Sequence, residues 1–147
     1  MHFFEITGLL NHTPYYLHGI DVLYSAAVTA QLRQKLRTLK RPLVAKFPSE
    51  ATRQKEIKSI YMTATDGIIS LQNKVGFYDD LNVQDFDERW DEICCVLSEA
   101  PSYETMLTYL EAIGLDIHEF NAFYGSNTIQ NAILYAKDLK DRYTVLW

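Results

Sequence analysis

Two histidines, His2 and His18, are the residues of this 147-residue chain whose type and position could support chemistry. His18 is followed by Gly19 at the start of an apolar segment with helical periodicity. The imidazole therefore lies near the positive end of the expected helix dipole, which disfavours its protonated form and leaves a neutral ring that can bind metal. A histidine at a helix start usually has a structural role, however, so position alone favours that role over metal ligation.

The remaining residues do not complete a catalytic site by themselves. A catalytic zinc site needs three protein ligands, and the sequence places no carboxylate beside the two histidines. His12 lies in a turn-like stretch before Pro14 and is expected to face solvent, and His118 is expected to have a surface or helix-capping role. The sequence has no glycine-rich phosphate loop, nucleophile elbow or Cys/His pair. It offers no means of binding a dinucleotide or providing a nucleophile unaided.

Composition narrows the class of protein. The net charge of -5 and pI of about 5.3 argue against nucleic acid and anionic membranes as partners, because both need a clustered positive field. The basic run Arg33–Arg41 is spread over several faces of a helix end. No apolar stretch reaches the roughly 18 residues that span a bilayer. The adjacent Cys94 and Cys95 are predicted to be small core residues in a reducing compartment, and the protein is expected to be cytoplasmic.

Prolines, capping residues and apolar spacing predict one all-α domain, a bundle of about seven helices. No run alternates with period two, so no strand is predicted. Ser49 and Ser102 are predicted caps, and Asp85 or Asp87 is expected to cap the helix that carries Trp90. The predicted segments are Met1–Leu10, Gly19–Leu39, one long or kinked helix from Ser49 through Leu71, Trp90–Leu97, Ser102–Gly114, Ile117–Tyr124 and Ile129–Asp141.

Three segments carry a resemblance to a known family. They are His2-Phe3-Phe4-Glu5, then Leu17-His18-Gly19 with Val22 following, and the ending Tyr135–Trp147, which includes Asp141-Arg142-Tyr143-Thr144-Val145-Leu146. In order and spacing they resemble the C-terminal helical domain of sn-glycerol-1-phosphate dehydrogenases, within the wider group of iron-containing alcohol dehydrogenases and glycerol dehydrogenases. The resemblance covers nearly the whole chain, and the Asp-Arg-Tyr-Thr-Val-Leu ending is its most distinctive part.

The resemblance implies an organisation and a metal site. Residues 1–147 would be a single helical metal-binding domain, truncated at both ends, without the N-terminal domain that binds NAD(P)H. A divalent metal, zinc or else nickel or iron, would be held by an Asp from the first half of the enzyme and two histidines from the second. His18 matches one of those ligands. His2 matches a neighbouring histidine with a catalytic role, which orders substrate or relays a proton, and the other ligand would precede Met1.

The function implied is reduction of dihydroxyacetone phosphate to sn-glycerol 1-phosphate by NADH or NADPH, with the metal polarising the ketone oxygen. A small-molecule phosphate substrate and a homodimer are the partners implied. Arg142 could tether the phosphate, although a helix-end salt bridge is the simpler role for it. The isolated chain is expected to be inactive and to bind metal weakly. Two alternatives remain: a free-standing helical interaction module, or a domain of a glycerol or alcohol dehydrogenase with a different substrate.

Overall fold

The computed structural model describes residues 1–41, 48–76, 78, 83–141 and 146. All regular structure in these residues is helical, which confirms the expected all-α class. Where about seven helices were expected, the described residues form six α-helices of ten residues or more, two shorter ones and two 3-10 segments. They are α1 (His2–Asn11), α2 (His18–Arg37), α3 (Glu50–Tyr61), η1 (Met62–Ala64), α4 (Thr65–Val75), α6 (Val83–Glu88), α7 (Trp90–Ser98), α8 (Tyr103–Ala112), α9 (Ile117–Tyr135) and η2 (Ala136–Leu139).

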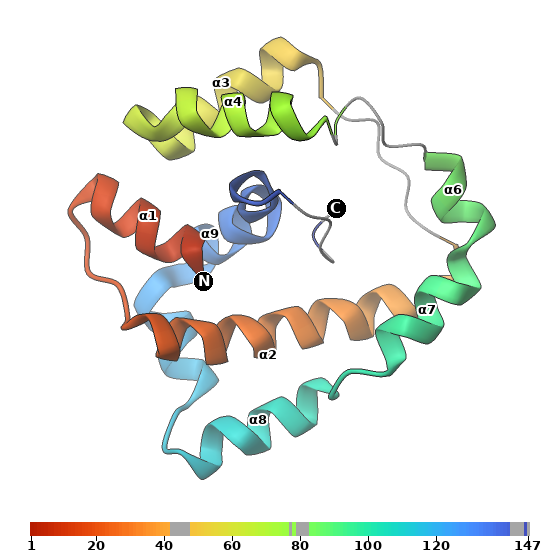
Figure 1. Ribbon diagram of the computed structural model, residues 1–147. Coiled ribbons are helices and arrows are strands. Elements are labelled where there is room, and N and C mark those ends of the chain that lie inside the picture. Colours follow the sequence, from red (N-terminus) through yellow and green to blue (C-terminus); the bar gives the residue numbers. More distant parts are fainter. Residues whose placement is uncertain (42–47, 77, 79–82, 142–145, 147) are drawn as a thin grey trace.

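The long helix α2 forms the middle layer of the fold (Figure 1). Its most extensive contact is with α8, which runs along one side, and α7 packs near its C-terminal end. On the other side α1 lies between α2 and the paired helices α3 and α4, and it also contacts α9 and η2. The N-terminal helix is thus enclosed by segments from both halves of the chain.

Aromatic rings hold these helices together. Phe120 on α9 is fully buried, and its ring centroid lies 5.4 Å from that of Phe4 on α1 and 4.8 Å from that of Tyr24 on α2. Phe4 also stacks on Tyr124, at 4.2 Å. Offset and edge-to-face pairs at these separations add to the hydrophobic stabilisation of the buried rings. The α1, α2 and α9 helices therefore meet around one aromatic cluster: Phe4, Tyr24, Phe120 and Tyr124.

The local helix signals are confirmed in part. The hydroxyls of Ser49 and Ser102 accept hydrogen bonds from the backbone N–H groups of Thr52 and Thr105, as expected of N-caps. The helix predicted as long or kinked from Ser49 through Leu71 is broken at Met62, whose φ is 42°.

Three other expectations are wrong in detail. Asp85 and its neighbour Asp87 lie inside the short helix α6, and Arg89 is the residue that precedes α7. Gly125, at φ 74°, separates two helical segments within α9. The second segment was expected to extend to Asp141, but it ends at Tyr135 and is followed by the 3-10 segment η2. The cysteines are not core residues, because Cys95 is exposed and its neighbour is only partly buried.

A buried polar contact joins η2 to Tyr78, which follows α4 in the chain. Asp138 is buried, and its carboxylate accepts a hydrogen bond of 2.7 Å from the Tyr78 hydroxyl. Burial raises the pKa of Asp138 above its ordinary value of 3.8, although the Tyr78 hydrogen bond and the charges of Lys137 and Arg53 act in the opposite direction. Ionising this carboxylate in the folded protein therefore costs more than ionising it in the unfolded chain.

This cost predicts a pH dependence of stability. Because the folded pKa is raised, the stabilising effect of the protonated form is complete below pH 3.8 and is lost as pH rises through the folded pKa. As pH rises through the folded pKa of Asp138, we expect the free energy of unfolding of Asp138→Asn to increase relative to that of wild type. At higher pH the difference between the two proteins should stay constant. Denaturant unfolding measured between pH 3.5 and pH 7 checks this, with the exposed Glu111→Gln as the control. A difference between wild type and Asp138→Asn that does not change with pH would contradict it.

Candidate metal centre

The connection between α1 and α2 turns the chain back on itself. α1 ends at Asn11, and His12, the residue that follows, adopts the left-handed conformation. The backbone N–H groups of His12 and Thr13 both donate to the Gly8 carbonyl. A Cβ on Gly8 would lie 2.6 Å from the Tyr15 ring, so this glycine permits the connection to pack directly on α1. The start of α2 consequently returns to the side of α1 that carries Glu5.

A hydrogen-bonded chain then fixes the first turn of α2. The Tyr124 hydroxyl on α9 accepts a hydrogen bond from the Tyr16 backbone N–H at 3.0 Å and donates to the Asp21 carboxylate at 2.8 Å. Asp21 is completely buried, and burial raises its pKa, while the hydrogen bond from Tyr124 acts in the opposite direction. The backbone on both sides of His18 is thereby tied to α9.

Three side chains that can ligate metal meet where the start of α2 lies beside α1. His2 and Glu5 lie one turn apart on α1, and His18 is the first residue of α2. Glu5 Oε1 lies 2.5 Å from His18 Nδ1, and Glu5 Oε2 lies 3.4 Å from His2 Nδ1. The two imidazole rings are 5.4 Å apart between centroids. One donor atom from each of the three residues lies within 4.8 Å of the other two.

The electrostatics keep the carboxylate charged and His2 neutral. Desolvation acts to raise the pKa of Glu5, but the hydrogen bond and charge of His18, with those of His2, outweigh it, so the pKa is lowered. The pKa of His2 is also lowered, first by desolvation and then by the charge of Lys140, against the opposing hydrogen bond to Glu5. An ionised carboxylate beside a neutral imidazole is the protonation state that a metal ion requires.

This donor set fits a divalent transition metal. Imidazole nitrogens and carboxylate oxygens are ligands that zinc, nickel and iron(II) accept. Ligand bonds of about 2.1 Å in a tetrahedral site put the donor atoms about 3.4 Å apart. The donor atoms of His2, Glu5 and His18 lie within 4.8 Å of one another, so side-chain rotations would be enough to bring them to this separation.

Sequence reasoning identified two members of this cluster and missed the third. The structure brings His2 and His18 together, whereas His12 and His118 are exposed elsewhere, as expected. Glu5 was not predicted, although its position three residues after His2 on an expected helix places both on one face. Arg142, for which a helix-end salt bridge was favoured over a phosphate contact, lies outside the described residues, as does most of the ending Asp141–Leu146.

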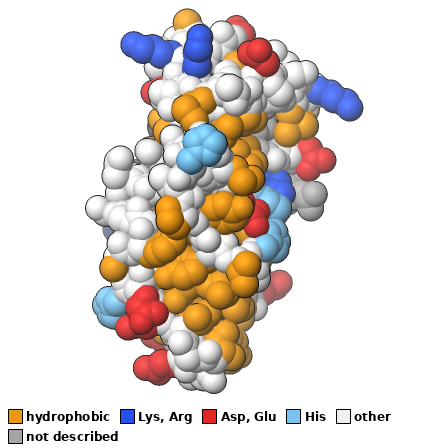
Figure 2. Space-filling view, turned by 90° about the vertical axis from the view of Figure 1, so that its left-hand side faces the viewer, with side chains coloured by type: hydrophobic (Ala, Val, Ile, Leu, Met, Phe, Trp, Pro, Cys, Tyr) orange, Lys and Arg blue, Asp and Glu red, His pale blue; other side chains and the backbone are white. Residues whose placement is uncertain are grey.

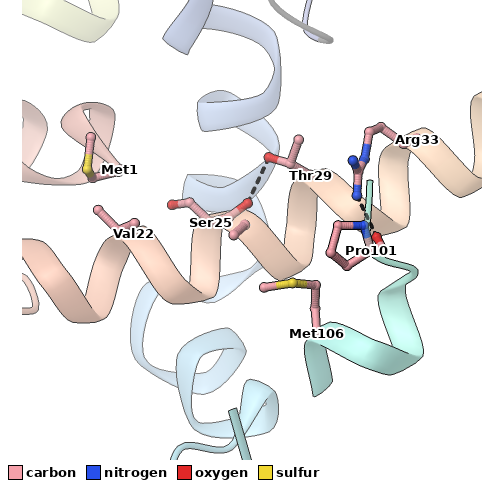
Figure 3. Close-up of a pocket in the computed structure, with 8 residues that line it drawn as sticks. Met1, Val22, Ser25, Thr29, Arg33, Pro101 and Met106 are labelled. Carbon is pink, nitrogen blue, oxygen red and sulfur yellow. Dashed lines mark hydrogen bonds between the residues drawn. The ribbon is translucent and has the colours of Figure 1, made fainter. Parts of the chain in front are cut away.

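A groove of about 380 Å³ begins next to this cluster and runs along α2 (Figure 3). Met1 and Val22 lie at one end and Ser25 and Thr29 on its floor, and its lining is mainly apolar. Arg33, the charged member of the lining, donates to the Pro101 carbonyl at 2.7 Å. The groove thus suits an apolar group better than a phosphate.

Comparison with known proteins gives no further identification. No protein-family model, curated protein or solved structure matches the chain. Among the described residues, no helix has both the length and the apolar character needed to cross a membrane. Among the described residues, His2, Glu5 and His18 form a group that could hold a metal ion.

Proposed function

We propose that this chain is the helical, metal-binding domain of a metal-dependent NAD(P)H-linked dehydrogenase, with dihydroxyacetone phosphate as the substrate reduced to sn-glycerol 1-phosphate. The observation that carries the proposal is the convergence of His2, Glu5 and His18 from two helices on one point. The resemblance of the His2 and His18 segments to glycerol-1-phosphate dehydrogenases supports the same assignment from the sequence.

In this proposal His18 is a metal ligand and His2 lies next to the metal on the substrate side. The metal, when bound, supplies a Lewis acid that polarises the ketone oxygen. His2 stays neutral, because desolvation and Lys140 lower its pKa, and so can accept or donate one hydrogen bond to a substrate hydroxyl. The aromatic cluster behind α1 holds its backbone in place, while the nicotinamide cofactor is bound outside the described residues.

Zinc titration of the purified chain, followed by calorimetry, tests the metal site. We expect weak binding of one zinc ion per chain, because His18 is the ligand that this proposal assigns to the described residues. His18→Ala should weaken that binding more than about 100-fold, because loss of a ligand exceeds the 10- to 100-fold typical of an outer-shell partner. His118→Ala is the matched control, since His118 is exposed and lies in α9 away from the cluster. Equal zinc affinity in wild type and His18→Ala would refute the site.

The enzymatic part needs a separate assay. The protein isolated from its natural source should oxidise NADH or NADPH when given dihydroxyacetone phosphate, and a chelator should abolish that oxidation. If the protein instead reduces NAD(P)⁺ when given glycerol or a simple alcohol, and a chelator abolishes this reduction, the protein would be assigned as a dehydrogenase of different substrate.

An interaction module is the second candidate, favoured by exposed apolar side chains. Figure 2 shows many of these gathered on the face where the α1–α2 connection and the start of α9 lie. Leu17 is 78% exposed, and Tyr15 and Phe123 are also exposed. Contiguous apolar surface of this kind marks contacts with another protein. A chain that binds no zinc in the titration above would favour this candidate, including a homodimer through this face.

A further inference from the structure

We propose that Glu5 is a positioning residue that holds His18 in one tautomer and one orientation, with the proton on Nδ1 and the Nε2 lone pair directed to the metal. This inference deepens the proposed metal site and rests on it. It assigns a role to a side chain that the sequence did not identify.

The contacts around Glu5 point to this role. Its two carboxylate oxygens face the Nδ1 atoms of two different histidines, at 2.5 Å from His18 and 3.4 Å from His2. The shorter contact is a charge-assisted hydrogen bond and the longer one is weak. More than half of the His18 side chain is exposed, so packing restrains the ring little. The Glu5 hydrogen bond is then the specific contact, among the described residues, that sets its orientation.

The chemistry of imidazole gives the consequence. A neutral ring has one nitrogen that donates and one that accepts, and the hydrogen bond at one nitrogen determines the state of the other. An ionised carboxylate can only accept, so His18 must donate its Nδ1 proton to Glu5, and the lone pair resides on Nε2. A carboxylate that orients a histidine in this way also raises its strength as a metal ligand.

The rival arrangement uses Glu5 as a direct ligand. The cluster also allows the Glu5 carboxylate and the two Nδ1 atoms to bind one ion, since such donors lie within 4.8 Å of each other. That arrangement would put the metal on Nδ1 of His18, where the observed hydrogen bond lies. The lowered pKa of Glu5 fits either arrangement, so the two are separated by which nitrogen carries the proton once metal is bound.

Nitrogen NMR of the ¹⁵N-histidine-labelled chain at pH 8 reads the tautomer directly, with His18 assigned from the His18→Ala spectrum. We expect Nδ1 of His18 to give the signal of a protonated nitrogen and Nε2 that of an unprotonated one. Adding Zn²⁺ should shift Nε2 while Nδ1 keeps its proton. In Glu5→Ala the Nδ1–H preference should disappear, and in the control Glu99→Ala, an exposed carboxylate after α7, it should persist.

Zinc affinity supplies the second readout. Glu5→Ala should raise the zinc dissociation constant about 10- to 100-fold, and Glu5→Gln, which keeps the side-chain size and an accepting oxygen, should raise it less. Circular dichroism checks that both variants keep the helical fold. A wild-type His18 with its proton on Nε2, or one that binds zinc through Nδ1, overturns the positioning role.

The outcomes separate this inference from the proposed function. If zinc binds to wild type and Glu5→Ala with equal affinity, the metal site stands and the positioning role fails. If the chain binds no zinc, the metal function fails, whatever the tautomer of His18 in the metal-free protein.

Discussion

Replacing Phe120 with alanine should lower the free energy of unfolding by about 3–5 kcal/mol, the range found when a fully buried phenylalanine is truncated. The Phe120 ring is completely buried and lies within 5.4 Å of the Phe4 and Tyr24 rings and 5.1 Å from Tyr124, between centroids. Truncation leaves a cavity whose walls belong to three helices, so relaxation of one helix cannot fill it.

The control for this variant is Phe123→Ala, one turn away on the same helix. Phe123 is 44% exposed and contacts Tyr16 and Tyr124, so its loss should cost less than about 1.5 kcal/mol. Urea unfolding followed by far-ultraviolet circular dichroism measures both variants. Equal destabilisation by the two substitutions would mean that the α1, α2 and α9 helices do not meet around Phe120 as described.

Gln72→Ala is expected to have the second largest effect, a loss of about 2–4 kcal/mol in the free energy of unfolding. The Gln72 amide nitrogen donates to the backbone carbonyls of Asp138, at 2.7 Å, and Lys140, at 3.0 Å. Alanine would leave both acceptors without this donor, and each buried unsatisfied group costs about 1–3 kcal/mol. Among the described residues, the buried amide oxygen of Gln72 has no hydrogen-bond partner, which offsets part of the loss.

Asn73→Ala, the neighbouring substitution on the exposed face of α4, is the control and should change stability by less than about 0.5 kcal/mol. Hydrogen exchange of the η2 amides gives a local measurement, because these amides should lose protection in Gln72→Ala before the core amides do. Unchanged protection in η2 would show that Gln72 does not hold this segment.

The parts of the fold that depend on local chemistry could be predicted from the sequence. Ser49 and Ser102 are N-caps because a hydroxyl can reach a backbone N–H three residues ahead, a relation visible in the sequence itself. The break at Met62 could not be predicted, because methionine has no intrinsic preference for a φ of 42° and packing between α3 and α4 must impose it.

In the candidate site, too, one part follows from local sequence spacing and the other depends on packing between distant residues. The spacing of His2 and Glu5 on one helix face is local and could have been predicted. The approach of His18 to Glu5 depends on Tyr15 packing against Gly8, a contact that no periodicity in the sequence indicates. The Asp85 and Asp87 prediction failed because an acidic residue before an apolar run is equally compatible with the first turn of an extra helix, which is α6 here.

The hydrogen bonds of Tyr124 also have a consequence for protein synthesis. Tyr124 follows its partners Tyr16 and Asp21 by 108 and 103 positions. The first turn of α2 therefore cannot be anchored before Tyr124 has been synthesised. Loop closure over such a separation must precede the final placement of His18. The cluster of His2, Glu5 and His18, although all three residues lie within the first eighteen positions of this sequence, therefore reaches its final geometry only after translation has passed α9.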